Sequence, residues 1–249
     1  MALMILTVLF SPVIRALPSS TGTGFEHVEA ISATENDSVD VSSLPLHLFR
    51  SQKPDNNKPL VVIISGDGGW NNFTDGLAKA YVDKGLDVAG IDALRYFWHK
   101  SNPKTASGDV SKVIRYFSTK WHKKQVILLG YSFGADVLPF IFNDFENDVK
   151  SMIPLLVFMS PSHHASFEFQ LTGWLKGDVD SPYLVVPEIK KIRGPVIMII
   201  YGRKESENLT GDFPGGSIHF VPVQGGHHFD DNYTSLIDPV LRQFDSLLR

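Results

Sequence analysis

The sequence Val126-Ile127-Leu128-Leu129-Gly130-Tyr131-Ser132-Phe133-Gly134-Ala135 decides how this chain of 249 residues folds. An apolar run leads into Gly130-Tyr131-Ser132-Phe133-Gly134, and a helix-like stretch begins at Ala135. A turn this tight holds its serine in strained backbone geometry, and the small residues on both sides avoid clashes. The strain raises the Ser132 hydroxyl above the sheet, where a histidine can reach it. The pattern therefore predicts a nucleophilic serine between a strand and a helix.

The segments around this turn alternate between continuous apolar runs and amphipathic runs from Leu44 onward. That alternation is typical of a mostly parallel sheet covered by helices. The run Leu60 to Ile64 is rich in Val and Ile, as expected of a central strand buried on both faces. Together with Gly-x-Ser-x-Gly, this order predicts an α/β protein with the α/β-hydrolase fold. We expect strands at residues 46–49, 60–64, 86–91, 125–129, 153–159, 196–201 and 218–223, and helices at 73–82, around 110–117, from 135 and around 236–247.

The first 43 residues differ in composition from the rest of the chain. Ala2 to Phe10 form an apolar stretch that is too short to span a bilayer, and Ala16 is a small residue at a suitable cleavage point. We therefore predict a signal peptide over residues 1–17, which implies export. Residues 18–43 are rich in Ser, Thr, Gly, Asp and Glu and are predicted to form a linker. The hydrolase domain is then expected over residues 44–249.

The alternation lapses between Ser160 and Ile192, where α/β-hydrolases commonly insert a cap. The aromatic residues of this stretch are Phe167, Phe169, Trp174 and Tyr183. The stretch is either a surface loop with a small satellite core or a lid that shapes the substrate pocket. Long insertions in compact domains tend to be functional, and we predict a small cap insertion here.

Composition excludes several classes of function. Hydrophobic residues make up 43% of the chain and charged residues 20%, which is ordinary for a globular protein with a full core. The formal net charge of -4 offers no basic surface for nucleic acid. The chain has no cysteine, which removes disulfides, a thiolate nucleophile and cysteine-ligated metal. His163 and His164 are adjacent and point to opposite sides of an extended chain. We expect no metal, no cofactor, no nucleic-acid partner and a monomer.

A nucleophilic serine in this fold needs a histidine as its base, and that base follows the last strand. There the sequence reads Gln224-Gly225-Gly226-His227-His228-Phe229-Asp230, a glycine-rich loop with two adjacent histidines. We favour His228, because a histidine followed directly by an aromatic residue is the commoner arrangement in such loops. His227 is the alternative base.

The acid that supports the histidine should follow the strand at residues 196–201. Glu205 fits, because it comes three residues after the turn glycine Gly202. Glu207 in the same loop is the alternative. The acid holds the imidazole tautomer and stabilises the imidazolium that forms when Ser132 loses its proton.

The oxyanion hole needs two backbone N–H groups directed at the tetrahedral oxygen. Phe133, directly after the serine, is expected to supply one. The loop Ser65-Gly66-Asp67-Gly68-Gly69-Trp70 should supply the other, because its glycines allow the backbone to approach the substrate. Asp67 is the expected donor and Gly68 the next candidate. This loop lacks the Gly-Lys-Ser/Thr ending of a phosphate-binding P-loop, which disfavours nucleotide binding.

Five blocks of sequence in a fixed order resemble the VirJ/AcvB family of bacterial virulence proteins. The resemblance runs from about Leu44 to the C-terminus. The blocks are Ser65-Gly66-Asp67-Gly68-Gly69-Trp70, Leu94-Arg95-Tyr96-Phe97-Trp98, Gly130-Tyr131-Ser132-Phe133-Gly134-Ala135-Asp136-Val137-Leu138-Pro139-Phe140, Leu171-Thr172-Gly173-Trp174 and Gly225-Gly226-His227-His228-Phe229-Asp230. The resemblance implies a periplasmic α/β-hydrolase with Ser132 as the nucleophile, His228 or His227 as the base, and the acid within residues 205–208.

The resemblance also implies a substrate. AcvB-type members are known as lysyl-phosphatidylglycerol hydrolases, and VirJ is linked to type IV secretion of virulence proteins. We therefore expect a periplasmic serine esterase that acts on an aminoacyl-lipid ester at the membrane surface, with lysyl-phosphatidylglycerol as the first candidate. The amines of a lysyl group would favour a nearby carboxylate, and Asp67 and Asp136 are candidates by location. Gly68 and Asp136 are the predicted substrate-binding residues, although Asp136 is alternatively a structural acid.

Two other functions are compatible with the sequence. One is a serine esterase for a different acyl ester. The other is a periplasmic adaptor that binds type IV secretion proteins through an inherited fold and has little catalytic activity, because fold alone does not fix function.

Overall fold

The computed structural model describes residues 40–99, 101–167, 181–216 and 218–248. The predicted signal peptide and residues 18–39 of the predicted linker lie outside these ranges, as do Phe169 and Trp174 of the predicted cap. Within the described ranges, no helix is long and apolar enough to cross a membrane.

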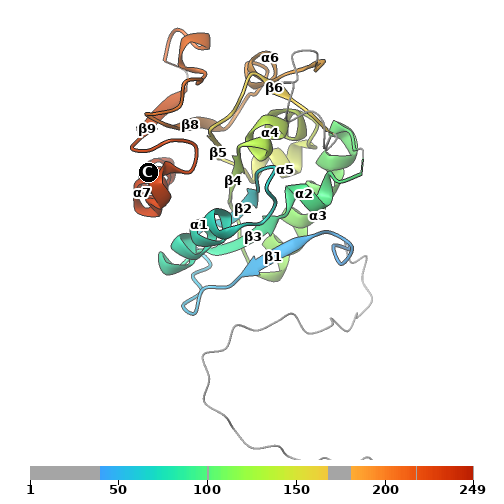
Figure 1. The fold of residues 1–249 in the computed structure, drawn as a ribbon. Helices are drawn as coiled ribbons and strands as arrows, with labels where there is room; N and C mark the ends of the chain where they lie inside the picture. The colour runs from blue at the N-terminus through green and yellow to red at the C-terminus, as the bar shows by residue number, and fades with distance from the viewer. Residues whose placement is uncertain (1–39, 100, 168–180, 217, 249) are drawn as a thin grey trace, which may run out of the picture. The chain divides into compact units, whose positions relative to one another are not determined.

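Seven strands form one sheet in the order β1-β3-β2-β4-β5-β8-β9 (Figure 1). β1 is antiparallel to β3, and the other neighbouring pairs are parallel. The strands are β1 (Leu46–Phe49), β2 (Leu60–Ile64), β3 (Asp87–Ile91), β4 (Val126–Tyr131), β5 (Leu155–Met159), β8 (Val196–Gly202) and β9 (His219–Val223). The predicted mostly parallel sheet is confirmed, and each predicted strand is present with its ends shifted by at most two residues.

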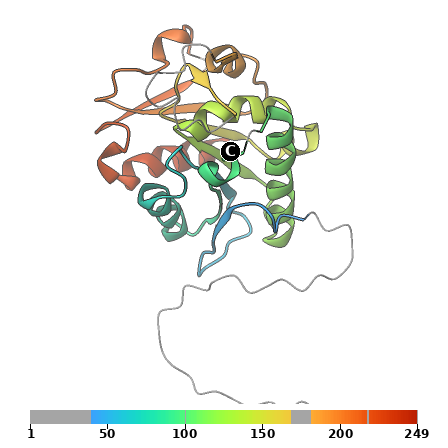
Figure 2. The same ribbon diagram turned by 45° about the vertical axis from the view of Figure 1, so that its right-hand side comes forward.

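Helices cover both faces of the sheet (Figure 2). α1 (Asn72–Asp83) and α7 (Tyr233–Ser246) pack on one face, and α3 (Pro103–Lys120) and α4 (Phe133–Asn143) pack on the other. Successive residues of a strand point to opposite faces, so each central strand contributes to two core clusters. This double burial explains why the central strands are continuous apolar runs. Three shorter helices are α2 (Ala93–Tyr96), α5 (Asn147–Ser151) and α6 (Val185–Ile189).

The described part of the predicted cap insertion packs against α4. Two short strands, β6 (His164–Ala165) and β7 (Tyr183–Leu184), pair antiparallel in a separate two-stranded sheet. Phe167 is buried, and its ring centroid lies 4.9 Å from that of Tyr183 and 5.8 Å from that of Phe140 in α4. These aromatic contacts hold both ends of the insertion close to the helix that follows Ser132.

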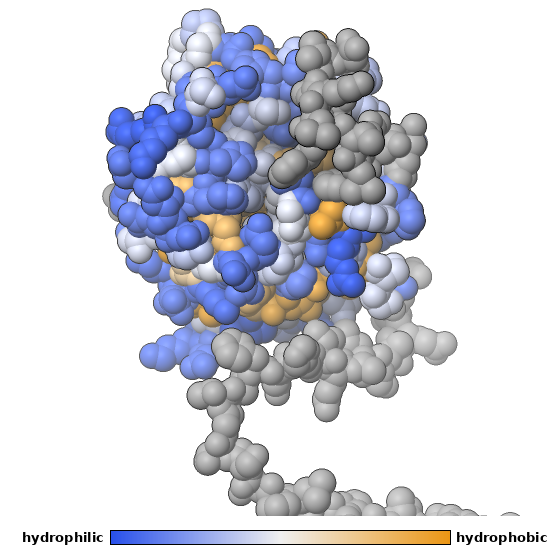
Figure 3. Space-filling view, viewed as in Figure 1, coloured by the Kyte–Doolittle hydropathy of each residue, from blue (hydrophilic) through white to orange (hydrophobic). Residues whose placement is uncertain are grey.

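The two edges of the main sheet are β1 and β9. β9 contains Pro222, which lies opposite Tyr201 of β8. Proline has no backbone N–H, so a sheet tolerates it only where one side of the strand is free of a partner. On the face drawn in Figure 3, hydrophobic residues form small separate patches among hydrophilic ones.

The parallel strands bring the predicted site residues to one edge of the sheet. β2, β4, β5, β8 and β9 all end at their carboxyl termini on the same side. The loops that leave these ends carry the glycine-rich segment, Ser132, Glu205 and the two histidines. This edge is where open α/β sheets place their ligands.

Candidate active site

Ser132 occupies a strained turn between β4 and α4. Its φ angle is 52°, in the left-handed region, and α4 begins at the next residue. Glycine is required on both sides of the serine. A Cβ atom at Gly130 would lie 2.4 Å from the carbonyl oxygen of Gly134, and one at Gly134 would lie 2.3 Å from that of Ile64. The Gly-x-Ser-x-Gly pattern therefore reflects close backbone packing, as predicted for a nucleophile elbow.

Ser132, His227 and Glu205 form an unbroken series of hydrogen bonds. Nε2 of His227 lies 2.8 Å from Oγ of Ser132, and Nδ1 lies 2.7 Å from Oε1 of Glu205. The two ring nitrogens thus contact the serine and the carboxylate at the same time. Glu205, rather than Glu207, is the acid that reaches the imidazole, in agreement with the prediction that favoured Glu205.

The prediction that favoured His228 as the base is wrong in this geometry. His228 points to the other side of the loop, where its Nδ1 lies 2.9 Å from Oη of Tyr131. The reason is the path of the backbone after it. Phe229, Asp230 and Asp231 have φ angles of 54°, 50° and 52°, and the Phe229 side chain is completely buried. This left-handed turn carries His228 toward α1 and leaves His227 facing Ser132.

Glu205 is held by two further donors. Its Oε2 accepts hydrogen bonds from the hydroxyl of Ser160, at 2.9 Å, and from the backbone N–H of Gly202, at 2.7 Å. Ser160 follows β5 directly and has a φ angle of 49°. Sequence reasoning missed Ser160. The available signal was its position, because β5 and β8 are neighbours and a residue just after β5 lies beside the loop after β8.

The electrostatics of the series suit a histidine base. The hydrogen bond that His227 donates to Glu205 raises the pKa of His227 above its ordinary value, against the opposing effect of burial. Burial raises the pKa of Glu205, but hydrogen bonds from His227, Gly202 and Ser160 outweigh it and leave the pKa below its ordinary value. Glu205 is therefore ionised at neutral pH and stabilises an imidazolium on His227.

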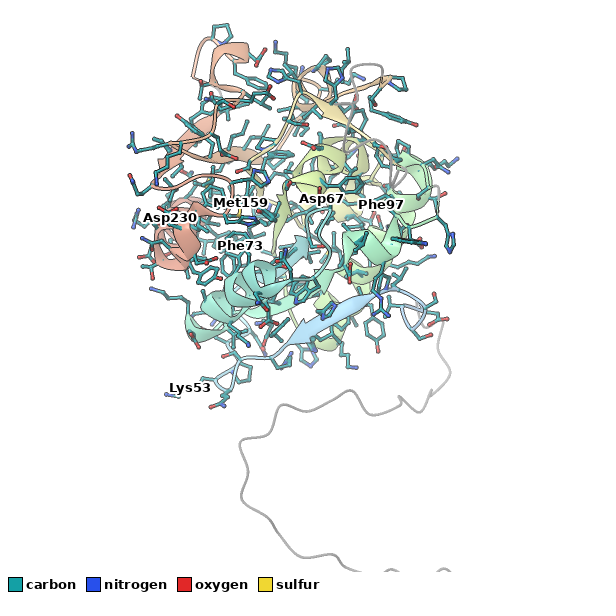
Figure 4. The ribbon with its side chains drawn as sticks, in the orientation of Figure 1. Lys53, Asp67, Phe73, Phe97, Met159 and Asp230 are labelled. Atoms are coloured by element: carbon teal, nitrogen blue, oxygen red, sulfur yellow. The ribbon has the colours of Figure 1, made fainter. Side chains whose placement is uncertain are left out.

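The glycine-rich loop after β2 lies directly against the nucleophile. A Cβ atom at Gly66 would lie 3.3 Å from Cβ of Ser132. The loop closes on itself where Gly69 N–H donates to the carbonyl oxygen of Gly66, at 3.0 Å. In Figure 4, the labels of Asp67 of this loop, Met159 and Phe73 lie near the centre of the view. The loop therefore lies against Ser132, and the assignment of Asp67 as an oxyanion donor stays a prediction.

The predicted oxyanion donors differ in their surroundings. Phe133 is the first residue of α4, and the first N–H groups of a helix have no acceptor within that helix. The N–H of Gly68 donates to the Asp67 carboxylate, at 2.8 Å. Gly68 is thus engaged with its neighbour, and the backbone positions at Asp67 and Phe133 are the better pair of candidates.

Asp136 lies in the first turn of α4, one turn beyond Ser132. Its Oδ1 accepts a hydrogen bond from the backbone N–H of Ser162, at 2.6 Å. Burial raises the pKa of Asp136 to about 8, and the nearby Asp67 carboxylate acts in the same direction. Asp136 thus joins α4 to the inserted segment and also lies within the electrostatic range of His227.

The described residues offer one open groove beside the base loop and no cluster for a metal. The groove has a volume of about 470 Å³ and is lined by Asn71, Asn72, Phe73, His228 and Asp231. Across the same described residues, no group of three or more His, Cys, Asp or Glu side chains is arranged to hold a metal ion. Of the two adjacent histidines considered in the sequence, His163 instead pairs with Asp212, with 3.1 Å between Nε2 and Oδ2.

A serine after β4, a glutamate after β8 and a histidine after β9, on a mostly parallel sheet, define the α/β-hydrolase class. Solved structures with the same fold agree with this assignment. Est1E from Butyrivibrio proteoclasticus with bound ferulic acid superposes with a TM-score of 0.55 at 14% identity, covering 83% of this chain and 96% of that one. The esterase domain of a Rhodothermus marinus protein gives 0.52 at 12% identity, covering 81% and 97%. A thioesterase domain from the curacin biosynthetic pathway gives 0.51 at 14% identity, covering 80% and 100%.

Within this class, the chain belongs to the VirJ family of bacterial virulence proteins, because the model of that family matches residues 58–248. No curated protein sequence matches the chain. The family match covers the glycine-rich loop, the nucleophile elbow and the loops that carry Glu205 and His227.

Proposed function

We propose that this VirJ-family protein is a serine ester hydrolase that works through an acyl-enzyme on Ser132. The observation that carries the proposal is the hydrogen-bond series Glu205–His227–Ser132, with distances of 2.7 Å and 2.8 Å. A series of this kind, with the serine on a strained turn beside a glycine-rich loop, has the parts that nucleophilic catalysis needs.

Each residue has a definite task in this reaction. Nε2 of His227 removes the proton of Ser132 as Oγ attacks the ester carbonyl. Glu205 keeps the proton on Nδ1 and stabilises the imidazolium. The N–H groups of Phe133 and Asp67 bind the oxyanion, and loss of one such donor costs about 2.7–4 kcal/mol of transition-state stabilisation. His227 then protonates the leaving alcohol, and the same base activates water to release the acid from Ser132.

The proposed substrate is an aminoacyl ester of a phospholipid, with lysyl-phosphatidylglycerol first, met at the membrane surface in the periplasm. The family resemblance supports this choice, and the carboxylates of Asp67 and Asp136 beside the nucleophile are compatible with an acyl group that carries ammonium groups. A cation bound next to Asp136 would favour its ionised form and offset the effect of burial. Contacts with type IV secretion proteins belong to the same family-based proposal.

The test is incubation of the protein with lysyl-phosphatidylglycerol vesicles while free lysine is measured. Wild type should release lysine, and Ser132→Ala and His227→Ala should each reduce the rate by roughly 10⁴-fold or more. Lysine release that persists in Ser132→Ala would refute the acyl-enzyme. If wild type releases no lysine but hydrolyses short acyl esters, the lipid substrate is wrong and the esterase stands. If it hydrolyses neither, the protein is an adaptor.

The role of the carboxylates is tested with two substrates. Asp136→Asn and Asp67→Asn should raise KM several-fold for a lysyl ester and leave KM for a neutral ester of the same alcohol nearly unchanged, because only the first substrate is cationic. Equal changes for both esters would show that these carboxylates do not recognise the amine.

A further inference from the structure

Tyr131, the residue before the nucleophile, makes two hydrogen-bond contacts with the loop that carries the base. Its side chain is buried, and its hydroxyl donates to the backbone carbonyl oxygen of His227, at 3.2 Å. The same oxygen lies 2.9 Å from Nδ1 of His228. The contacts therefore join β4, one residue from Ser132, to the backbone of one histidine and the side chain of the next.

The two contacts together place a hydrogen on Nδ1 of His228. A tyrosine hydroxyl has one proton to donate, and it also has lone pairs that accept. If that proton goes to the His227 carbonyl, the contact with His228 is a hydrogen bond only when Nδ1 of His228 is the donor. The chain of donors then runs from His228 to Tyr131 to the His227 carbonyl. Burial raises the pKa of Tyr131, so the hydroxyl keeps its proton over the working pH range.

The base loop needs such a support because its backbone is strained. Three consecutive non-glycine residues after His228, namely Phe229, Asp230 and Asp231, have positive φ. Residues held in such conformations persist only where the surroundings over-determine them. The buried ring of Phe229 stacks on Phe73 and anchors the end of the loop. The Tyr131 contacts act on His227 directly.

We propose that Tyr131 and His228 form a clamp that fixes the His227 imidazole between Glu205 and Ser132, and that both are positioning residues for the reaction. The inference rests on the proposed function, in which His227 is the base. The clamp ties the base to the strand that delivers the nucleophile, so the Nε2–Oγ distance is set by two hydrogen bonds close to Ser132 and not by the whole loop. His228 contributes by its Nδ1–H and takes no proton from the serine.

The first test removes only the clamp hydroxyl. Tyr131→Phe should lower kcat for a short-chain p-nitrophenyl ester by about tenfold with KM nearly unchanged, because the ground-state contacts remain. The acid limb of the kcat/KM profile should also move to lower pH, since a less well-held imidazole loses part of the Glu205 hydrogen bond that raises its pKa. Tyr81→Phe is the matched control: that hydroxyl is buried in α1, has no hydrogen-bond partner among the described residues, and its removal should change neither quantity.

The second test separates the two histidines. His227→Ala should lose roughly 10⁴-fold in kcat, whereas His228→Ala and His228→Asn should lose only about tenfold. Because the clamp acts as one unit, the double variant Tyr131→Phe/His228→Ala should lose no more than the single variants. A double variant whose loss equals the product of the two single losses would overturn the clamp, as would a His228→Ala variant as inactive as His227→Ala.

A spectroscopic measurement keeps the clamp testable apart from catalysis. In protein with ¹⁵N-labelled histidine, the NMR titration of His227 should move to lower pH in Tyr131→Phe and stay in place in Tyr81→Phe. An unchanged titration of His227 in Tyr131→Phe would refute the clamp even in a fully active enzyme. If no ester is hydrolysed but the titration shifts, the proposed function fails and the clamp stands.

Discussion

Ser160 holds Glu205 in the conformation that reaches His227, and it does so from a strained backbone position. Its hydroxyl is one of two donors to Oε2, and its φ angle of 49° is unfavourable for any residue with a side chain. Two substitutions at this position separate the effect of the hydroxyl on activity from the effect of the strained backbone on stability.

Ser160→Ala and Ser160→Gly should both lower kcat/KM by about tenfold, because each removes a hydrogen bond to a charged carboxylate. The glycine variant should be more stable than the alanine variant by about 1 kcal/mol, since glycine adopts positive φ without a steric penalty. Ester hydrolysis and urea unfolding measure the two effects. Full activity in both variants would show that Gly202 and the protein fold hold Glu205 without Ser160.

Asp136 should make the protein less stable as the pH rises. Its pKa in the folded protein, about 8, lies above the ordinary value of 3.8, so the folded state binds this proton more tightly than the unfolded chain. The stabilisation is complete below pH 3.8 and is lost as the pH rises to about 8. Asp136→Asn keeps an acceptor for Ser162 and has no proton to lose. Its Tm should exceed that of wild type increasingly between pH 5 and about pH 8 in thermal unfolding; parallel Tm curves would contradict the raised pKa.

The two adjacent histidines show what the local sequence can and cannot predict about single residues. Gly-Gly-His-His-Phe predicted a histidine base in this loop, and the structure places one at Ser132. Which histidine faces the serine depends on the left-handed turn at residues 229–231 and on the burial of Phe229. Positive φ is usually predicted from glycine or asparagine in the sequence. Residues 229–231 contain neither, so their left-handed turn could not be predicted.

At the scale of elements, the elbow depends on the closeness of β2, β4 and α4. Gly134→Ala would place a Cβ atom 2.3 Å from a backbone oxygen of β2, which cannot move aside easily. We expect a loss of about 3 kcal/mol in stability together with most of the activity. Gly108→Ala in the middle of α3 is the matched control, because no described residue places an atom within 4 Å of its added Cβ atom. It should stabilise the protein by roughly 0.5–1 kcal/mol. Chemical unfolding of both variants checks the contrast; similar effects would show that the elbow can adjust.

Elements with a hydrophobic pattern were predictable, and two-residue pieces were not. The strands at Leu60–Ile64 and Leu46–Phe49 have the predicted bounds, because apolar residues between flanking turns define a strand. The two-residue strands β6 and β7 pair with each other across residues far apart in sequence, and such short pieces carry no periodic pattern. The link from Ser160 to Glu205 was missed for the same reason, since it exists only through the pairing of β5 with β8.

At the scale of the whole molecule, a buried ion pair lies at the end of the sheet away from the candidate site. Lys123 precedes β4 and Asp87 begins β3; both side chains are fully buried, with 2.9 Å between Nζ and Oδ2. The backbone N–H of Ser51 donates to Asp87, and Lys123 donates to the carbonyl oxygen of Asp55. Nε of the more exposed Arg50 lies 3.5 Å from Oδ1 of Asp87. The pair therefore fastens the segment between β1 and β2 to the amino ends of the strands.

Lys123→Met should destabilise the protein by about 3 kcal/mol, because it removes the buried cation beside Asp87 and leaves the more exposed Arg50, at 3.5 Å, as the cation next to it. The double variant Lys123→Met/Asp87→Asn should recover part of that loss. Neither variant should alter kcat at a temperature where it is folded, since Ser132 lies at the carboxyl ends of the strands. Urea unfolding and ester hydrolysis measure the two properties. A change in kcat in the double variant would show that the two ends of the sheet are coupled.

Pro222 in the edge strand β9 has a consequence for molecules in a crowded solution. An open sheet edge is a template on which another chain can add a strand, and many proteins aggregate in this way. In sheets, proline turns its nitrogen toward solvent, so β9 lacks one of the donors that an incoming strand would use. The strand has only five residues and Pro222 is the fourth, so the missing donor shortens any new ladder. We therefore expect β9 to be a poor template for edge-to-edge pairing with another copy of the chain.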